Sequence, residues 1–248
     1  MTEPAAAVAP NRGVAMTAPA AAVAPNCGVP MTAPAAAVAP NCGVAMIEAI
    51  AVIARPQAVA IHGSWQVIHL DAVLPTPWRN GGGVTRELAC WPDSRDWVWR
   101  MSVAEVAASG PFSRFEGVQR WFAVLGGAGV RLRIGAQTHQ LTGSSAPLCF
   151  DGASPVDCEL LDGATQDFNL MQRGPRAGAA MRRIYGSHRF VLDAPKWVAL
   201  YAIDSACQIV HEGAVMELPA RTLAWQALPQ GAMLQVSGGA ALWLEVVA

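Results

Sequence analysis

Alternation of apolar and polar residues is the sequence feature that most constrains the fold of this chain. The run "GVRLRI" places Val130, Leu132 and Ile134 on one side of a strand and Arg131 and Arg133 on the other. Similar runs, such as "WVWRMSVAEV", "TLAWQAL" and "ALWLEVV", are separated by turn signals such as "LGGAG", "LDG" and "HEG". Period-2 alternation, aromatic and β-branched content and a spacing of about ten residues are typical of sandwiches and barrels. The sequence therefore predicts an all-β fold.

The same order of strands and turns occurs twice. The segment "RWFAVLGGAGVRLRIGAQTHQL" reads as three strands joined by turns, and "KWVALYAIDSACQIVHEGAVMEL" reads in the same way about 75 residues later. Each segment continues into a strand-rich stretch. We therefore expect two small barrels packed as one body, an N-terminal barrel over residues 63–176 and a C-terminal barrel over residues 177–248.

The first 45 residues repeat a 15-residue unit, of which "MTAPAAAVAPNCGVP" is one copy. Proline interrupts any helix that the alanines would support, and the unit has no large apolar residue to stack on a neighbouring copy. All tryptophans, phenylalanines and tyrosines lie at or after Trp65. We expect a disordered tail over residues 1–62. A docking tether is the functional alternative for this tail.

Charge and cysteine content exclude several classes of partner. The formal net charge is −1, with 17 basic and 18 acidic residues, so no electrostatic reason favours nucleic acid or an anionic membrane. None of the six cysteines lies in a Cys-x-x-Cys pair, which favours a reducing compartment. The N-terminus lacks a basic segment followed by an apolar one, as a secretory signal would have. The cytoplasm is the expected location.

The stretch "PTPWRNGGGVTREL", from Pro75 to Leu88, has three consecutive glycines. A phosphate-binding P-loop needs a lysine after its glycines, and a dinucleotide fingerprint needs a helix there, whereas a strand follows here. One interpretation is a sharp turn or a close backbone approach. The other is the rim of a pocket, with backbone N–H groups facing a ligand and Asn80, Thr85 and Arg86 supplying side chains.

Patterns for metal binding and nucleophilic catalysis are missing from the sequence. The five histidines form neither a His-x-His nor a His-Glu-x-x-His motif, and His139 stands without an acidic neighbour. No Gly-x-Ser-x-Gly motif is present, and the cysteines lack a basic context that would activate them. We therefore expect no metal, no cofactor and no catalytic residue.

Polar residues do occur inside strongly apolar strands. Each of them alone could be the solvent-facing residue of a half-buried strand. Together they indicate a small polar pocket with arginine available for a carboxylate, because polar groups inside a barrel must find partners there. These residues are Arg86, Glu87, Arg100, Ser102, Arg114, Asp167 and Asn169.

Four segments, "PWRNGGGVTREL", "RMSVAEVAASGPFSRFEGVQRWFAVLGGAGVRL", "CFDG" and "DFNLM", resemble the HutD/Ves family. The resemblance runs from about Ser64 to the C-terminus and is dense from Pro77 to Arg173. It implies a bicupin fold, with two cupin-like barrels or jelly rolls in one chain, an association into homodimers and an absence of the usual cupin metal ligands. It also implies a link to histidine utilisation, without an established catalytic activity.

The motif positions of the family carry over to a set of candidate residues here. From them we predict ligand-binding roles for Asn80, Gly82, Thr85, Arg86, Glu87, Ser102, Phe112, Arg114, Asp167 and Asn169. Arg86 or Arg114 would pair with a carboxylate, and Trp78, Phe112 and Phe115 would form the walls.

Three hypotheses for function stay open at this point. The first is a non-enzymatic regulatory protein that binds urocanate or a similar small anionic metabolite. The second is a metal-independent isomerase or hydrolase acting on such an acid, with Glu87 or Asp167 as general base. The third is a protein-interaction module that uses the tail.

Overall fold

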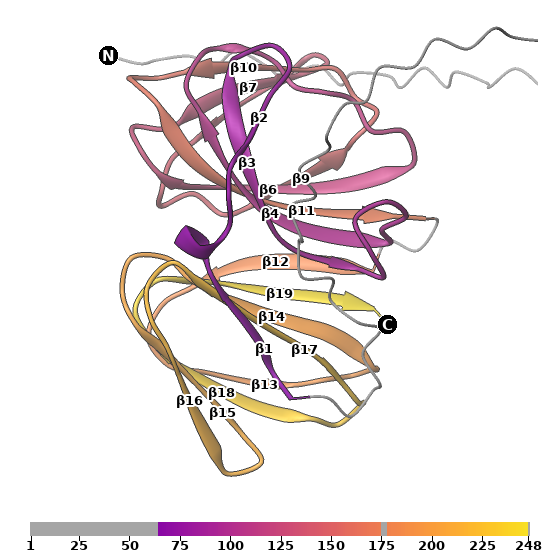
Figure 1. The fold of residues 1–248 in the computed structure, drawn as a ribbon, viewed down its shortest axis with the longest axis vertical. Helices are drawn as coiled ribbons and strands as arrows, with labels where there is room; N and C mark the ends of the chain where they lie inside the picture. Colours follow the sequence, from indigo (N-terminus) through magenta and orange to yellow (C-terminus); the bar gives the residue numbers. More distant parts are fainter. Residues whose placement is uncertain (1–63, 175–177, 248) are drawn as a thin grey trace, which may run out of the picture. The chain divides into compact units, whose positions relative to one another are not determined.

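The computed structural model describes residues 64–174 and 178–247, which contain 19 strands and one short 3₁₀ helix, η1 (Leu70–Ala72) (Figure 1). The predicted disordered tail, residues 1–62, lies outside the described residues, as does the predicted boundary at residue 176. The prediction of an all-β fold with two barrels is confirmed.

Two antiparallel sheets form the first barrel. The six-stranded sheet has the order β2-β3-β4-β11-β6-β9, and the four-stranded sheet has the order β5-β10-β7-β8. The strands of the larger sheet are β2 (Thr76–Pro77), β3 (Gly83–Trp91), β4 (Trp99–Val106), β11 (Thr165–Arg173), β6 (Val118–Gly126) and β9 (Leu148–Asp151). Those of the smaller sheet are β5 (Gly110–Pro111), β10 (Val156–Leu160), β7 (Val130–Ile134) and β8 (Gln137–Leu141).

The second barrel pairs a five-stranded sheet with a four-stranded sheet. Their strand orders are β1-β17-β14-β19-β12 and β13-β18-β15-β16. The first contains β1 (Gln66–His69), β17 (Thr222–Leu228), β14 (Lys196–Ala202), β19 (Ala241–Val247) and β12 (Ala179–Ile184). The second contains β13 (His188–Val191), β18 (Met233–Gly238), β15 (Cys207–His211) and β16 (Ala214–Leu218).

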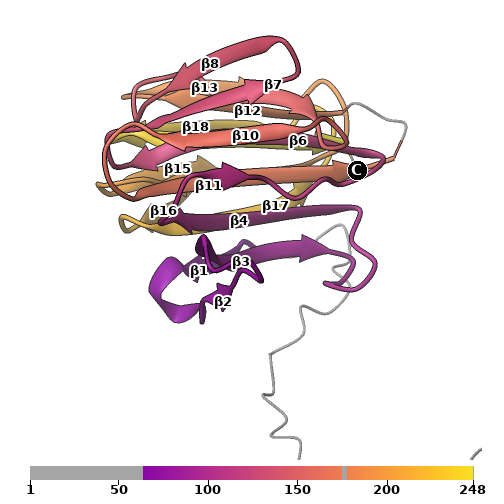
Figure 2. The same ribbon diagram turned by 90° about the horizontal axis from the view of Figure 1, so that it is seen from above.

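Strand β1 does not belong to the barrel that follows it in the sequence. It pairs antiparallel with β17, from Gln66 opposite Trp225 to His69 opposite Thr222. Figure 1 shows this indigo strand beside the orange strands of the second barrel, and Figure 2 shows the strands from above. The division of the sheets therefore differs from the expected N-terminal barrel of residues 63–176, because β1 belongs to the second barrel.

Apolar side chains form three large layers between the sheets and a smaller cluster of Cys90, Trp97, Val118 and Met171. One layer lies inside each barrel, and a third joins the six-stranded and five-stranded sheets. In β14, Trp197 and Tyr201 face this third layer, whereas Val198 and Leu200 face the interior of the second barrel. The central strands of the two larger sheets are buried on both faces for this reason, and they are more continuously apolar than half-exposed strands.

Candidate functional site

The first barrel holds a cavity of about 640 Å³, within the range of small-molecule sites. Its floor comes from strands β3, β4, β11 and β6, and its rim comes from residues before β3 and between β5 and β6. The lining residues are Thr76, Pro77, Trp78, Arg79, Asn80, Thr85, Glu87, Arg100, Ser102, Ala104, Pro111, Phe112, Ser113, Phe115, Arg120, Asn169 and Met171.

Strand register arranges the floor of the cavity in rows. Glu87 on β3 lies opposite Ser102 on β4, which lies opposite Asn169 on β11. In the next row, Met171 on β11 lies between Arg100 on β4 and Arg120 on β6. Residues two apart on a strand share a face, so the same face of four strands presents these polar groups to the barrel interior.

Arg120 is the most deeply buried charged residue on the floor of the cavity, with only 7% of its surface exposed. Its Nε and Nη2 donate to Asn169 Oδ1 at 3.1 and 2.8 Å, and its guanidinium lies over the rings of Phe112 and Phe150. Burial and the nearby Arg100 charge lower the pKa of Arg120 to about 10, so it stays cationic at neutral pH. No acidic side chain of the described residues forms an ion pair with it.

Arg100, a second arginine on the cavity floor, forms only a long ion pair. Arg100 Nε lies 3.7 Å from Glu87 Oε2, beyond hydrogen-bond distance, and it has no hydrogen-bond acceptor in the described residues. Its guanidinium lies 5.5 Å from the centre of the Trp97 ring. Because Glu87 balances the Arg100 charge, the Arg120 charge is left without a counter-charge in the cavity wall.

Asp167 lies deeper in the barrel, fully buried and outside the cavity lining. Its Oδ2 accepts from the Thr165 hydroxyl at 2.8 Å, whereas its Oδ1 has no partner in the described residues. Burial raises the pKa of Asp167 to about 7, although the Thr165 hydrogen bond and the Arg120 charge oppose the rise. Burial and the Asp167 charge also raise the pKa of the Cys158 thiol to about 12.

The three glycines belong to a turn whose N–H groups donate to acceptors within the turn itself. Gly81 N donates to Trp78 O at 3.0 Å, and Gly82 N donates to Asn80 Oδ1 at 3.1 Å. A Cβ on Gly83 would lie 2.3 Å from Glu105 O, so this position requires glycine, and the φ of +71° at Gly81 favours glycine there. The side chains on this turn line the cavity and the glycines do not, which favours the interpretation as a sharp turn with a close backbone approach.

One wall of the cavity is held by a hydrogen bond between its own residues. The Trp78 indole N–H donates to Thr85 Oγ1 at 2.8 Å, and the Trp78 ring meets the Phe112 ring edge-on at 6.5 Å. Aromatic side chains provide apolar area at fixed positions, which suits a flat ligand.

Replacing Thr85 with valine should loosen this wall. We expect Thr85→Val to lower the free energy of unfolding by about 1 kcal/mol, because it removes the acceptor of the Trp78 N–H while keeping the side-chain shape. Urea denaturation measures the change, and Thr138→Val, at an exposed position of β8, is the control. Equal losses in both variants would contradict the role of the hydrogen bond.

The structure brings together six of the ten predicted ligand-binding residues. These six line the cavity and are Asn80, Thr85, Glu87, Ser102, Phe112 and Asn169. The predicted walls Trp78 and Phe115 line it as well.

The other four predicted residues lie elsewhere. Arg86 follows Thr85 on β3 but belongs to the opposite face, where it pairs with Glu105. Arg114 is exposed in the connection between β5 and β6, although its two neighbours line the cavity. Gly82 serves the turn, and Asp167 is buried beneath the cavity.

Arg120 was not among the predicted residues, yet the sequence contains a signal for it. In "VQRWFAVLG", period 2 places Arg120 on the same face as Val118 and Phe122, both of which are buried. An arginine on the buried face of a strand needs hydrogen-bond partners inside the barrel. The alternation of Val118, Arg120 and Phe122 along β6 therefore predicts that this arginine faces the interior of the barrel.

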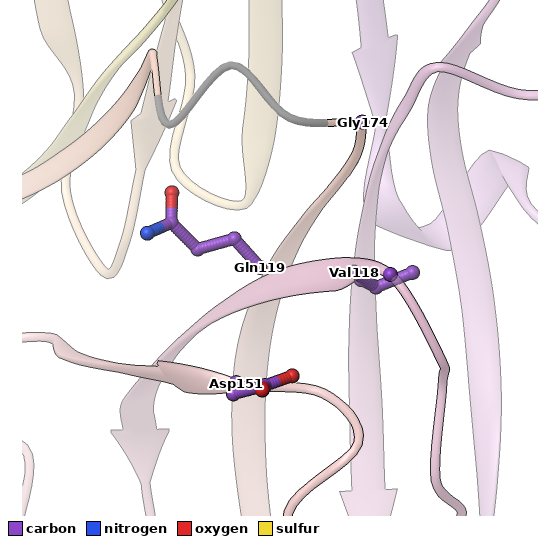
Figure 3. Close-up of a pocket in the computed structure, with 5 residues that line it drawn as sticks. Val118, Gln119, Asp151 and Gly174 are labelled. Carbon is purple, nitrogen blue, oxygen red and sulfur yellow. The ribbon is translucent and has the colours of Figure 1, made fainter. Parts of the chain in front are cut away.

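A second hollow of about 530 Å³ lies beside β6 (Figure 3). It is lined by Gly117, Val118, Gln119, Asp151 and Gly174. These residues include no basic side chain, so the hollow lacks the charge that an anion would need. In addition, the described part of the chain contains no group of three or more histidines, cysteines or acidic residues that could hold a metal ion.

The fold and the site define a two-barrel, cupin-like protein whose first barrel contains an arginine-lined cavity. Residues 71–244 match the model of the HutD family, and the chain belongs to this family. The resemblance to the HutD/Ves family is thereby confirmed.

Named relatives agree with this assignment. An "uncharacterized 21.2 kDa protein in hutC 3′region" of Pseudomonas putida is 37% identical over 141 residues, which are 55% of this chain and 73% of that protein. Protein Ves of Citrobacter koseri is 43% identical over 135 residues, covering 53% of this chain and 69% of Ves. The structure of HutD from Pseudomonas fluorescens, in a formate condition, has a TM-score of 0.66 and 28% identity over 74% of this chain and 98% of that one.

Proposed function

We propose that the chain binds a small carboxylic acid in the cavity of the first barrel, with Arg120 as the anchor of the carboxylate. The observation that carries this proposal is the buried Arg120 charge, which faces the cavity with an amide oxygen as its hydrogen-bond partner and forms no ion pair within the described residues. A buried charge is costly unless it is paired, and an anionic ligand would pair it. Arginine also matches the planar, two-oxygen geometry of a carboxylate.

Urocanate is the acid that we propose. Its flat conjugated ring suits a cavity walled by Trp78, Phe112 and Phe115. The P. putida relative is named for its position beside hutC, and the P. fluorescens relative is named HutD. These names support a link between the chain and histidine utilisation, in which our proposal gives it a regulatory role without catalysis. Of the two candidate bases, Asp167 does not line the cavity, whereas Glu87 does.

Titration calorimetry of the purified chain with urocanate tests the proposal. We expect saturable binding with a Kd below 1 mM, and NMR of the incubated mixture should show unchanged urocanate. An absence of binding at millimolar urocanate would remove the proposal. Conversion of urocanate to a product would favour the isomerase or hydrolase hypothesis instead.

A further inference from the structure

We propose that Glu87 determines which carboxylic acids the cavity accepts: it selects acids with an N–H donor at the end opposite the carboxylate and rejects dicarboxylates. This inference rests on the proposed binding of a carboxylate at Arg120. It adds a second contact point, a class of ligand and a residue that discriminates among ligands.

Asn169, Ser102 and Glu87 form one row across the cavity floor, with Asn169 beside Arg120 and Glu87 at the other end. Asn169, which accepts both Arg120 hydrogen bonds, lies opposite Ser102, and Ser102 lies opposite Glu87. Opposite residues of antiparallel strands are about 5 Å apart, so Glu87 and Asn169 are about 10 Å apart at their Cα atoms. All three side chains line the cavity, so a ligand held at Arg120 would extend along the row toward Glu87.

The Glu87 carboxylate has acceptor capacity left for a ligand. Its side chain is 33% exposed, toward the cavity that it lines. Its neighbours are Arg100 Nε, at 3.7 Å, and the thiol of Cys90, which is a weak donor. A carboxylate has about four acceptor positions, so neither neighbour satisfies it.

Glu87 is the acidic side chain of the cavity lining, in which the basic side chains are Arg79, Arg100 and Arg120. An N–H at the Glu87 end would donate a charge-assisted hydrogen bond, which is stronger than a neutral one. A second carboxylate would face the like charge of Glu87, and an apolar end would desolvate Glu87 without a donor. Ligands of equal length should therefore differ in affinity according to the group that they present to Glu87.

Three flat acids of similar length test the selection by calorimetry. Urocanate presents a ring N–H, trans-cinnamate presents a hydrocarbon ring, and trans,trans-muconate presents a second carboxylate. We expect cinnamate to bind at least about tenfold more weakly than urocanate, the scale of a charged hydrogen bond, and muconate more weakly still.

A substitution that keeps the shape of the side chain isolates the charge. Glu87→Gln should weaken urocanate binding about tenfold and strengthen muconate binding. It should also strengthen cinnamate binding, because an uncharged amide costs less to desolvate than a carboxylate. The matched control is Glu105→Gln on the neighbouring strand β4, where Glu105 pairs with Arg86 and does not line the cavity. It should leave the ranking of the three acids unchanged, and thermal unfolding of both variants reports whether they are folded.

The outcomes separate this inference from the proposed function. Equal affinity of the wild type for cinnamate and urocanate would overturn the selection by Glu87 and leave carboxylate binding intact. Tighter binding of muconate than of urocanate would also overturn it, since a dicarboxylate would then be bridging Arg100 and Arg120. If none of the three acids binds, the proposed function itself fails.

Discussion

Replacing Arg120 with methionine should weaken urocanate binding by roughly 10- to 150-fold, equivalent to about 1.5–3 kcal/mol for a hydrogen bond to a charged group. Methionine keeps much of the length of the side chain and its contact with the rings of Phe112 and Phe150, but it has no charge and no donor. Calorimetry measures the change in affinity.

Arg86→Met is the matched control for this change. Arg86 lies on a neighbouring part of the same sheet but on its other face, paired with Glu105. We expect its affinity to stay within twofold of the wild type. If Arg86→Met binds urocanate weakly while Arg120→Met binds it as tightly as the wild type, Arg86 is the anchor and the site described above is wrong. If Arg120→Met does not fold, Arg120→Lys, which keeps the charge but not the paired donors to Asn169, should show an intermediate loss.

Asp167 should destabilise the folded chain progressively as the pH rises from 4 to 8, and Asp167→Asn should remove this contribution. Burial raises the pKa of Asp167 from 3.8 to about 7 in the folded chain. Between these values the folded state binds more protons than the unfolded state, so the free energy of unfolding falls with rising pH. The contribution of Asp167 is fully present below pH 4 and is lost as the pH passes through 7.

Urea denaturation at pH 4 and pH 8 measures this effect. At about 1.4 kcal/mol per pKa unit, the stability of Asp167→Asn relative to the wild type should increase by about 2–4 kcal/mol between the two pH values. Asparagine still offers an oxygen to the Thr165 hydroxyl. Asp157→Asn is the control, because Asp157 is in an exposed ion pair with Arg133, where little stability depends on charge. The same pH dependence in Asp167→Asn and the wild type would mean that Asp167 is not the titrating group.

Local alternation was sufficient to predict the strands, because each strand records which of its faces is buried. In β7, Val130 and Leu132 are buried, while Arg131 and Arg133 pair with Glu159 and Asp157 on β10. Local alternation does not predict which distant strands pair with each other. Nothing in "WQVIHL" indicates that β1 joins β17, about 150 residues away, because hydrogen bonds of the backbone are the same for any partner strand.

Residue type was sufficient to predict that polar and aromatic side chains would form the candidate site. It was not sufficient to predict which of two consecutive residues on a strand faces the cavity. Thr85, Arg86 and Glu87 are consecutive, and a shift of one residue exchanges the side chains that face the cavity. The register of β3 also shifts between Glu87 and Ala89. Period 2 alone therefore could not settle whether Arg86 or Glu87 faces the barrel. The row that joins Glu87 to Asn169 depends on the pairing of β4 with both β3 and β11, which no local pattern encodes.

The position of β1 has a consequence for any attempt to divide this chain. Residues 66–69 cover one edge of the five-stranded sheet, yet they precede the entire first barrel in the sequence. A fragment that begins at residue 178 would lack this strand and expose the backbone groups of β17, an edge prone to aggregation. An exchange of the second barrel between relatives would have to transfer two separate segments. The two barrels are thus joined by chain topology as well as by their shared core.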